Sequence, residues 1–157
     1  MRNLHEYKLT TIWKGNTGKG TSHVSEYDRS HSIIIGNKPQ LELTTDDAVF
    51  GDKSKLNPED LLVSAISSCH MLSYLYLCAK SRVVIVDYID NAIGLMFENP
   101  KGGGHFTEVI LNPVFTVAEN SMVEKAIALH KKAHEICFIA SSVNFKVSVE
   151  PSCKVLD

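Results

Sequence analysis

Apolar and polar residues alternate near the start of the chain. Between Tyr7 and Trp13 every second residue is Tyr, Leu, Thr or Trp, and this period of two predicts a half-buried strand. Glycine-rich residues 15–21 are interpreted as a hairpin turn, because a phosphate-binding loop needs Ser or Thr directly after its lysine, and here Gly20 follows Lys19. The same kind of signal predicts further strands at residues 22–27, 31–35 and 40–44.

The pattern changes to a helical one after a polar loop. Asn57 is a favourable N-cap and Pro58 a favourable first helical residue, which predicts a helix from Pro58 to about Lys80. Nearly every turn of this segment is apolar on more than one side, which is typical of a buried helix.

Strand signals return in the second half of the chain. Residues 83–98 and 105–117 are rich in β-branched and aromatic residues, and residues 143–149 alternate as a last strand. A capping box at residues 121–124 predicts the start of a second helix. The order βββ-α-ββ-α-β predicts an α+β fold with mainly antiparallel sheets, as a single domain over residues 1–157.

Composition narrows the class of protein. The chain has 157 residues and a net charge of -2 with both signs interspersed, so it carries no electrostatic footprint for nucleic acid. The first residues lack the apolar core of a signal peptide, and we expect no run to approach the roughly 20 apolar residues of a membrane span. We therefore expect a cytoplasmic protein whose thiols are kept reduced.

The cysteines carry the candidate chemistry. Cys69 and Cys137 each fall on a helical pattern, and two such thiols suggest a redox pair. Cys78 lies nine residues after Cys69, on the opposite side of the helix and roughly 13 Å along its axis, too far for a disulfide. We interpret Cys78 as a buried hydrophobic residue and Cys153, near the end of the chain, as a surface thiol.

Glu59 lies on the same predicted helix as Cys69. Ten residues separate the two by roughly 15 Å along the helix axis, so they cannot touch within one helix. They can meet if two copies of the helix cross antiparallel about a two-fold axis, which predicts an active site shared between two chains.

Three motifs resemble one family. The segments are residues 57–62 (Asn-Pro-Glu-Asp-Leu-Leu), residues 68–70 (Ser-Cys-His) and residues 133–137 (Ala-His-Glu-Ile-Cys). Together they resemble the OsmC/Ohr family (osmotically inducible protein C and organic hydroperoxide resistance protein), over nearly the whole chain. Residues 27–31 and 103–106 resemble its OsmC-like branch.

The resemblance implies a fold and an activity. Members of the family are intertwined homodimers with antiparallel sheets around two long central helices and two active sites at the interface. They reduce organic hydroperoxides without a metal or other cofactor, and a dihydrolipoyl dithiol commonly regenerates them. By resemblance Cys69 is the peroxidatic cysteine, Cys137 the resolving cysteine and Glu59 the carboxylate of the activating ion pair.

The chain departs from the family at one point. The arginine that pairs with the carboxylate normally lies in the loop before Asn-Pro-Glu, where this chain has Phe50. Arg29 is the best substitute, because its charge is permanent, and Lys53 and Lys55 are alternatives. The departure leaves open a second interpretation, an OsmC-like stress protein with a weakened or degenerate peroxidase site.

Two further alternatives come from the histidines. His130, His134 and Cys137 share one face of the second helix at a spacing suitable for a transition metal, although a packed helix face explains the same spacing. A Cys-His hydrolase would need His70 or His105 as the base for Cys69. Adjacent helical residues point about 100° apart, so His70 is poorly oriented for that role.

Overall fold

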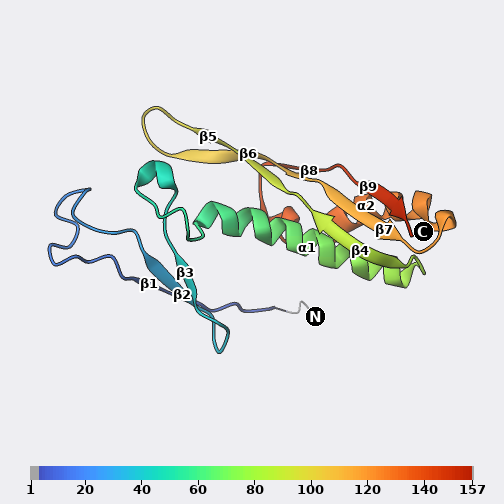
Figure 1. The fold of residues 1–157 in the computed structure, drawn as a ribbon, viewed down its shortest axis with the longest axis horizontal. Helices are drawn as coiled ribbons and strands as arrows, with labels where there is room; N and C mark the ends of the chain where they lie inside the picture. The colour runs from blue at the N-terminus through green and yellow to red at the C-terminus, as the bar shows by residue number, and fades with distance from the viewer. Residues whose placement is uncertain (1–3, 157) are drawn as a thin grey trace. The chain divides into compact units, whose positions relative to one another are not determined.

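A computed structural model describes residues 4–156 of the chain. Its elements follow the expected sequence of strands, a long helix, more strands and a second helix (Figure 1). The chain divides into two compact units, residues 1–61 and residues 62–157. The single domain predicted over residues 1–157 stays a prediction.

The first unit contains a three-stranded antiparallel sheet. Its strands are β1 (Thr10–Trp13), β2 (His31–Ile34) and β3 (Leu41–Leu43), in the order β1-β2-β3. All three were expected, although β1 begins later than predicted. A short 3-10 helix, η1 (Asp47–Val49), follows β3.

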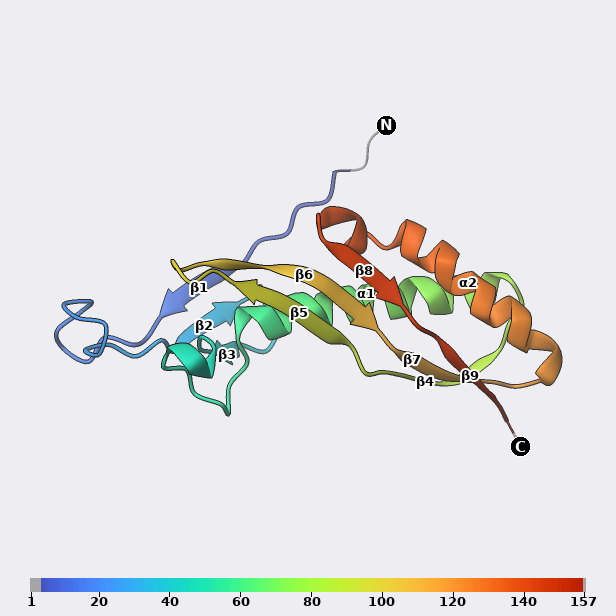
Figure 2. The same ribbon diagram turned by 90° about the horizontal axis from the view of Figure 1, so that it is seen from above.

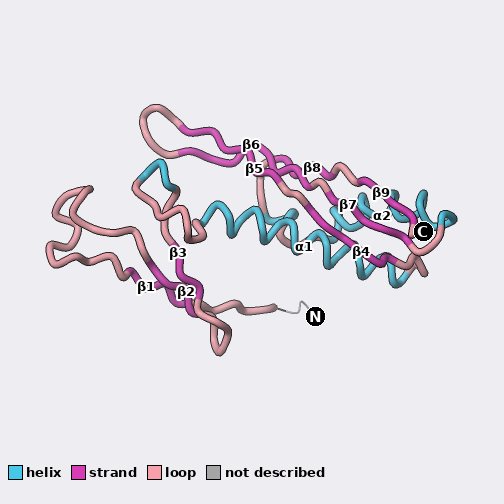
Figure 3. Tube along the Cα trace, viewed as in Figure 1, coloured by secondary structure: helices cyan, strands magenta, loops and turns pink. Residues whose placement is uncertain are grey.

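The strand predicted at residues 22–27 is wrong. That segment forms turns, and only Tyr27 makes an isolated bridge, to Asn16 (Figure 3). Side chains take hydrogen bonds that a strand would need: the His23 ring nitrogen Nδ1 accepts from the Ser25 backbone N–H at 3.3 Å, and the Thr17 hydroxyl donates to the Glu26 carbonyl. Local side-chain bonding therefore competes with the sheet here.

The first long helix, α1 (Pro58–Lys80), has the predicted bounds. Asn57 caps it as expected: its side-chain oxygen accepts from the Asp60 backbone N–H at 2.8 Å. The Asp60 carboxylate in turn accepts from the Asn57 backbone N–H at 3.1 Å. Two N–H groups at the helix start are satisfied in this way, which fixes where α1 begins.

The predicted burial of α1 holds for one stripe only. Ile66, His70, Tyr74 and Cys78 are buried at intervals of four residues, which places them on one face. On the opposite face Leu72 and Tyr76 are 63% and 60% exposed. The apolar character on all sides thus exceeds what this chain itself covers.

The expectation that no segment is suited to a membrane span is wrong by length and composition. Among the described residues, α1 is long and apolar enough to cross a membrane. That is weak evidence for a span, because the core helix of a soluble protein passes the same test. In this chain α1 packs a histidine and a tyrosine into its buried stripe.

The second unit contains two three-stranded sheets, with orders β4-β7-β9 and β5-β6-β8 (Figure 2). The pairs β4·β7 and β5·β6 are antiparallel, and the pairs β6·β8 and β7·β9 are parallel, so the sheets are mixed rather than purely antiparallel. The strands are β4 (Ile85–Asp90), β5 (Ile93–Glu98), β6 (Gly104–Leu111), β7 (Pro113–Val117), β8 (Lys146–Val149) and β9 (Ser152–Val155).

Each long β-rich stretch is therefore divided into two strands. The breaks fall at Asn91 and Asn112, which bond to one another: the Asn112 side chain donates to the Asn91 carbonyl at 3.0 Å. Asp90 reinforces the corner by accepting from the Asn112 backbone N–H at 2.8 Å. These paired corners let one continuous hairpin contribute to both sheets.

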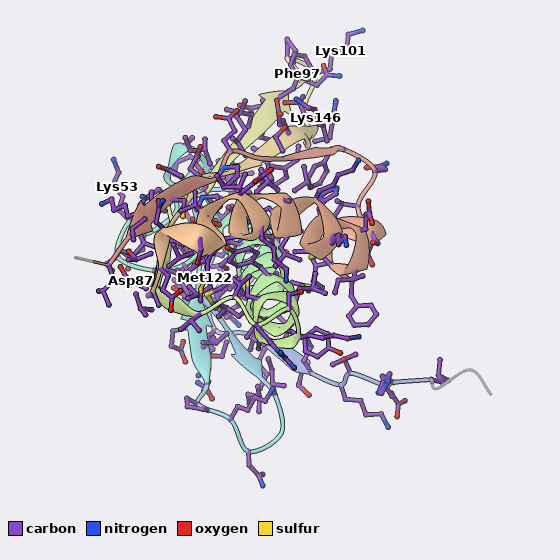
Figure 4. The ribbon with its side chains drawn as sticks, turned by 90° about the vertical axis from the view of Figure 1, so that its right-hand side faces the viewer. Lys53, Asp87, Phe97, Lys101, Met122 and Lys146 are labelled. Atoms are coloured by element: carbon purple, nitrogen blue, oxygen red, sulfur yellow. The ribbon has the colours of Figure 1, made fainter. Side chains whose placement is uncertain are left out.

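The second helix, α2 (Val123–Ile136), begins without the predicted capping box. A 3-10 turn, η2 (Asn120–Met122), precedes it, and the Ser121 hydroxyl donates to the Glu119 carboxylate instead. Met122 faces back toward the strands, where its sulfur accepts from the Val84 backbone N–H at 3.3 Å (Figure 4). The start of α2 therefore carries no side-chain cap.

Two clusters of buried residues form the core of this unit. The larger one joins α1, α2 and the sheet of β4, β7 and β9. The smaller one gathers Ile66, Val109 and Leu111, with apolar residues from β8 and the short 3-10 helix η3 (Ala140–Ser142) region around it. The helices thus pack against both sheets, which places the end of α2 close to the middle of α1.

Candidate dithiol site

Cys69 and Cys137 lie together. Cys69 is on α1, and Cys137 is the residue directly after α2, with extended rather than helical backbone. The expectation that both thiols sit within helices is therefore wrong for Cys137. The side chains of the two cysteines are joined by a hydrogen bond, and both thiols are free.

The two sulfurs differ in their surroundings. Cys69 is half-buried, whereas Cys137 is completely buried. Burial, followed by the hydrogen bond with Cys69, raises the pKa of the Cys137 thiol to about 11. The Ala140 backbone N–H donates to the Cys137 sulfur at 3.5 Å. At neutral pH Cys137 therefore holds its proton, and Cys69 is the thiol that solvent can reach.

Arg29 is held by two aromatic rings in the first unit. Its guanidinium carbon lies 4.2 Å from the Tyr27 ring centroid and 4.9 Å from the Phe50 ring centroid. Its terminal nitrogens donate to the backbone carbonyls of Tyr27 and Val24, each at 2.5 Å. Sequence reasoning named Arg29 and Phe50 separately, but nothing in the pattern indicated that they touch.

The predicted ion pair between Arg29 and Glu59 is not formed within the described part of this chain. Glu59 lies in the first turn of α1 and is half-exposed. Of the alternative cations, Lys55 donates to the Ser30 hydroxyl at 2.8 Å and lies 3.7 Å from the Asp52 carboxylate. Lys53 is exposed on the loop after η1 (Figure 4).

The other two cysteines have structural surroundings. Cys78 is 1% exposed in the larger core cluster, which confirms its interpretation as a buried hydrophobic residue. Cys153, interpreted from the sequence as a surface thiol or an idle one, lies on β9, half-buried and packed against the same cluster, so it is less exposed than a surface thiol. Burial raises the pKa of both thiols.

A pair of buried histidines joins the two helices, and sequence reasoning missed it. His70 Nε2 and His130 Nδ1 are 3.0 Å apart, so one ring donates its N–H to the other. The Tyr74 ring stacks on His130 with centroids 3.8 Å apart. The remaining ring nitrogens, His70 Nδ1 and His130 Nε2, are buried without a hydrogen-bond partner among the described residues.

Burial shifts both histidines toward the neutral form. It lowers the pKa of His70 to about 4, with His134 adding to the decrease and Asp90 opposing it. It lowers the pKa of His130 to about 3, with His70 adding to the decrease. A proton added to the pair would create a buried charge whose N–H group has no acceptor, so the pair is a neutral packing contact.

The arrangement of the histidines does not favour the two histidine alternatives. Among the described residues, no three His, Cys, Asp or Glu side chains gather in a way that could hold a metal ion. His70 bonds to His130, and the His105 ring packs against Phe97 with ring centroids 5.9 Å apart. A packed helix face accounts for the spacing of His130 and His134.

The site is thus a dithiol on an α+β scaffold, with one exposed and one buried sulfur. A model of the OsmC-like protein family matches residues 51–152. The chain belongs to the OsmC-like protein family, as its motifs indicated. No match was found among curated protein sequences.

Solved structures share the fold. An OsmC-like protein of unknown function from Vibrio cholerae is 30% identical, with a TM-score of 0.84, covering 94% of this chain and 99% of that chain. An organic hydroperoxide resistance protein from Elizabethkingia anophelis is 18% identical, with a TM-score of 0.70, covering 99% and 100%. Another from Legionella pneumophila is 19% identical, with a TM-score of 0.67, covering 96% and 99%. These likenesses confirm the predicted α+β, OsmC-like fold class.

Proposed function

We propose that the chain is a thiol-dependent peroxidase that reduces organic hydroperoxides, alkyl or fatty acid, to alcohols. The observation that carries the proposal is the hydrogen bond between the half-buried Cys69 thiol and the buried Cys137 thiol. A peroxidatic sulfur must be reachable by peroxide, and its resolving partner must wait close by and protonated. Membership of the OsmC-like family supports the same chemistry.

The reaction proceeds in three balanced steps. The Cys69 thiolate attacks the distal peroxide oxygen, which bears the hydrogen, and the O–O bond breaks. Cys69 becomes a sulfenic acid, and the leaving alkoxide takes a proton from solvent to become an alcohol. The Cys137 thiol then attacks the Cys69 sulfur, a disulfide forms, and hydroxide leaves with the Cys137 proton as water. An external dithiol, which the family resemblance implies is a dihydrolipoyl group, exchanges with this disulfide and restores both thiols.

Arg29 and Glu59 complete the proposed site. A guanidinium steadies a thiolate and a developing alkoxide because its charge is permanent. Glu59 would orient that guanidinium. Since Glu59 and Cys69 are about 15 Å apart along one helix, we propose that the site is completed in a homodimer. Cytoplasmic reducing conditions suit the four free thiols of the described chain.

The test is reduction of cumene hydroperoxide with dihydrolipoamide as the electron donor. Cys69→Ser is expected to abolish turnover, at least a hundredfold, because a hydroxyl does not replace a thiolate as the nucleophile. Cys153→Ser is the matched control: it changes a half-buried thiol outside the pair and should keep full turnover. Full activity in Cys69→Ser would end the proposal.

A second candidate is an OsmC-like stress protein with a weakened peroxidase site. Phe50 in place of the family arginine, and the bonding of Arg29 to two backbone carbonyls, favour it. Stoichiometric peroxide distinguishes the two candidates. A peroxidase loses two thiols per chain within seconds, and the intact chain becomes lighter by the two hydrogen atoms that a Cys69–Cys137 disulfide gives up, whereas a degenerate site oxidises no faster than free cysteine.

A further inference from the structure

Phe50, in the first unit, combines an unusual backbone conformation with a largely exposed side chain. Its φ is 70°, in the left-handed region that an aromatic residue rarely adopts, and its ring is 69% exposed. A residue held in such a conformation needs a cause in its surroundings.

The loop around Phe50 fixes that conformation. The backbone N–H groups of Val49 and Gly51 both donate to the Asp46 carbonyl, at 3.1 and 3.0 Å. A Cβ atom at Gly51 would lie 2.0 Å from the Thr45 carbonyl oxygen, so only glycine fits there. The backbone turn is therefore fixed on both sides of Phe50, and the exposed side chain lies outside the hydrophobic core.

The ring is directed at a cation. The Arg29 guanidinium carbon lies over both rings, 4.9 Å from the Phe50 ring centroid and 4.2 Å from the Tyr27 ring centroid. Tyr27 is itself steadied by an edge-to-face contact with Trp13, whose indole N–H donates to the Asp28 carbonyl at 2.8 Å. A guanidinium between two aromatic faces keeps its charge while losing rotational freedom.

We propose that Phe50 is a positioning residue: with Tyr27 it forms an aromatic cage that holds the Arg29 guanidinium in place for reaction with the peroxide. This inference rests on the proposed function, in which Arg29 is the cation of the site. It gives the residue at the family's arginine position a role that differs from the charge it replaces. The cation comes from residue 29, and residue 50 supplies the face on which it rests.

The cage itself can be tested without any activity. The chain has three arginines, so the Arg29 side-chain N–H signal is assigned by its loss in Arg29→Lys. In wild type and Phe50→Tyr the signal should be displaced by the ring current of residue 50. In Phe50→Leu, which keeps the apolar volume but not the ring, the displacement should be lost. An unchanged signal in Phe50→Leu would overturn the cage.

The positioning role is tested by a double-mutant cycle in kcat/KM for cumene hydroperoxide. Phe50→Leu should lower kcat/KM by about two- to thirtyfold, the range expected for a cation–π contact. It should also move the acid limb of the kcat/KM profile to higher pH, and Phe50→Tyr should restore both. In the Arg29→Ala background, Phe50→Leu should add less than twofold.

The outcomes separate this inference from the proposed function. An active wild type with an unaffected Phe50→Leu variant, or with additive losses in the double variant, overturns the positioning role alone. An inactive wild type overturns the proposed function. If Arg29→Ala keeps wild-type kcat/KM, the positioning role falls and another cation serves the thiols.

Discussion

At the scale of single residues, Cys69 and Cys137 differ in how much of each sulfur solvent can reach. Cys137 is completely buried, and burial together with the Cys69 hydrogen bond raises the pKa of its thiol to about 11. A thiol reacts with electrophiles as the thiolate, so reactivity and access both favour Cys69. This asymmetry supports the proposed roles, in which Cys69 attacks and Cys137 resolves, independently of any relative.

Pulse labelling should show this asymmetry directly. At pH 8 a thiol with a pKa of about 11 is ionised in about one molecule in a thousand. We therefore expect brief iodoacetamide exposure to modify Cys69 and to leave Cys137 unmodified, as read by peptide mass spectrometry. Labelling of Cys137 should rise only as the pH approaches 11.

Unfolding provides the control for that experiment. In concentrated urea both thiols lose their surroundings, and the two peptides should label at similar rates. Equal labelling of Cys69 and Cys137 in the native protein at pH 8 would contradict the burial of Cys137 as the source of the difference.

The sequence predicted that Cys69 and Cys137 lie close together, but it did not predict the surroundings of Arg29. Cys69 and Cys137 stand in motifs, and their pairing needs only that α1 and the end of α2 pack against each other. The contact of Arg29 with Phe50 depends on a left-handed backbone angle in a turn, and no periodic pattern records such an angle. Tyr27 is close to Arg29 in the sequence, but Phe50 belongs to a later loop. Only the fold brings both rings to Arg29.

At the scale of elements, the histidine pair connects α1, which carries Cys69, to α2, which ends directly before Cys137. His70 on α1 and His130 on α2 bond directly, with Tyr74 stacked on His130. In sequence the spacing of His130 and His134 resembles a metal motif. Its partner lies 60 residues earlier, on a helix whose relative rotation the sequence does not specify.

The pair should make the fold sensitive to acid. Each histidine titrates near 6.5 when unfolded and at about 4 (His70) or about 3 (His130) when folded, so the unfolded chain binds protons first as the pH falls. The contribution of the neutral histidine pair to the free energy of unfolding is fully present above about pH 6.5 and decreases as the pH falls below it. Between pH 7 and 5 we expect a loss of roughly 2 kcal/mol per histidine in urea unfolding.

A matched pair of variants isolates the cause. The double variant His70→Phe/His130→Phe keeps two stacked rings and removes both titrating groups, so its stability should change little between pH 7 and 5. His105→Phe removes an exposed histidine on β6 and should keep the acid sensitivity of the wild type. Equal acid sensitivity in all three proteins would exclude the buried pair as its source.

Local chemistry decided which elements could be predicted. Asn57 and Asp60 bond reciprocally at the start of α1, so the sequence signal and the structure agree. At α2 the same kind of signal failed, because the Ser121 hydroxyl bonds to Glu119 within a 3-10 turn. The strand β9 was not predicted, because it is short and directly follows Pro151, and proline is disfavoured within strands.

At the scale of the whole molecule, the second unit has more apolar surface than it covers. The α1 face opposite the buried stripe carries Leu72 and Tyr76, both more than half exposed. All six residues of β5 are exposed, including Leu95, Met96 and Phe97 (Figure 4 labels Phe97). A helix and a strand with apolar residues on both sides are typical of surfaces that a second copy covers.

Leu72 gives the proposed homodimer a direct test. Leu72→Lys would place an unpaired charge in the middle of the α1 face, and burying it against a second copy would cost about 3–5 kcal/mol. We expect light scattering to report twice the 17.4 kDa chain mass for wild type and a single chain mass for Leu72→Lys at micromolar concentration. Leu156→Lys is the matched control, since Leu156 is similarly exposed, at 56%, outside α1.

Because Glu59 and Cys69 can meet only between chains, Leu72→Lys should also lose peroxidase turnover while Leu156→Lys retains it. An active, monomeric Leu72→Lys would show that one chain carries a complete site.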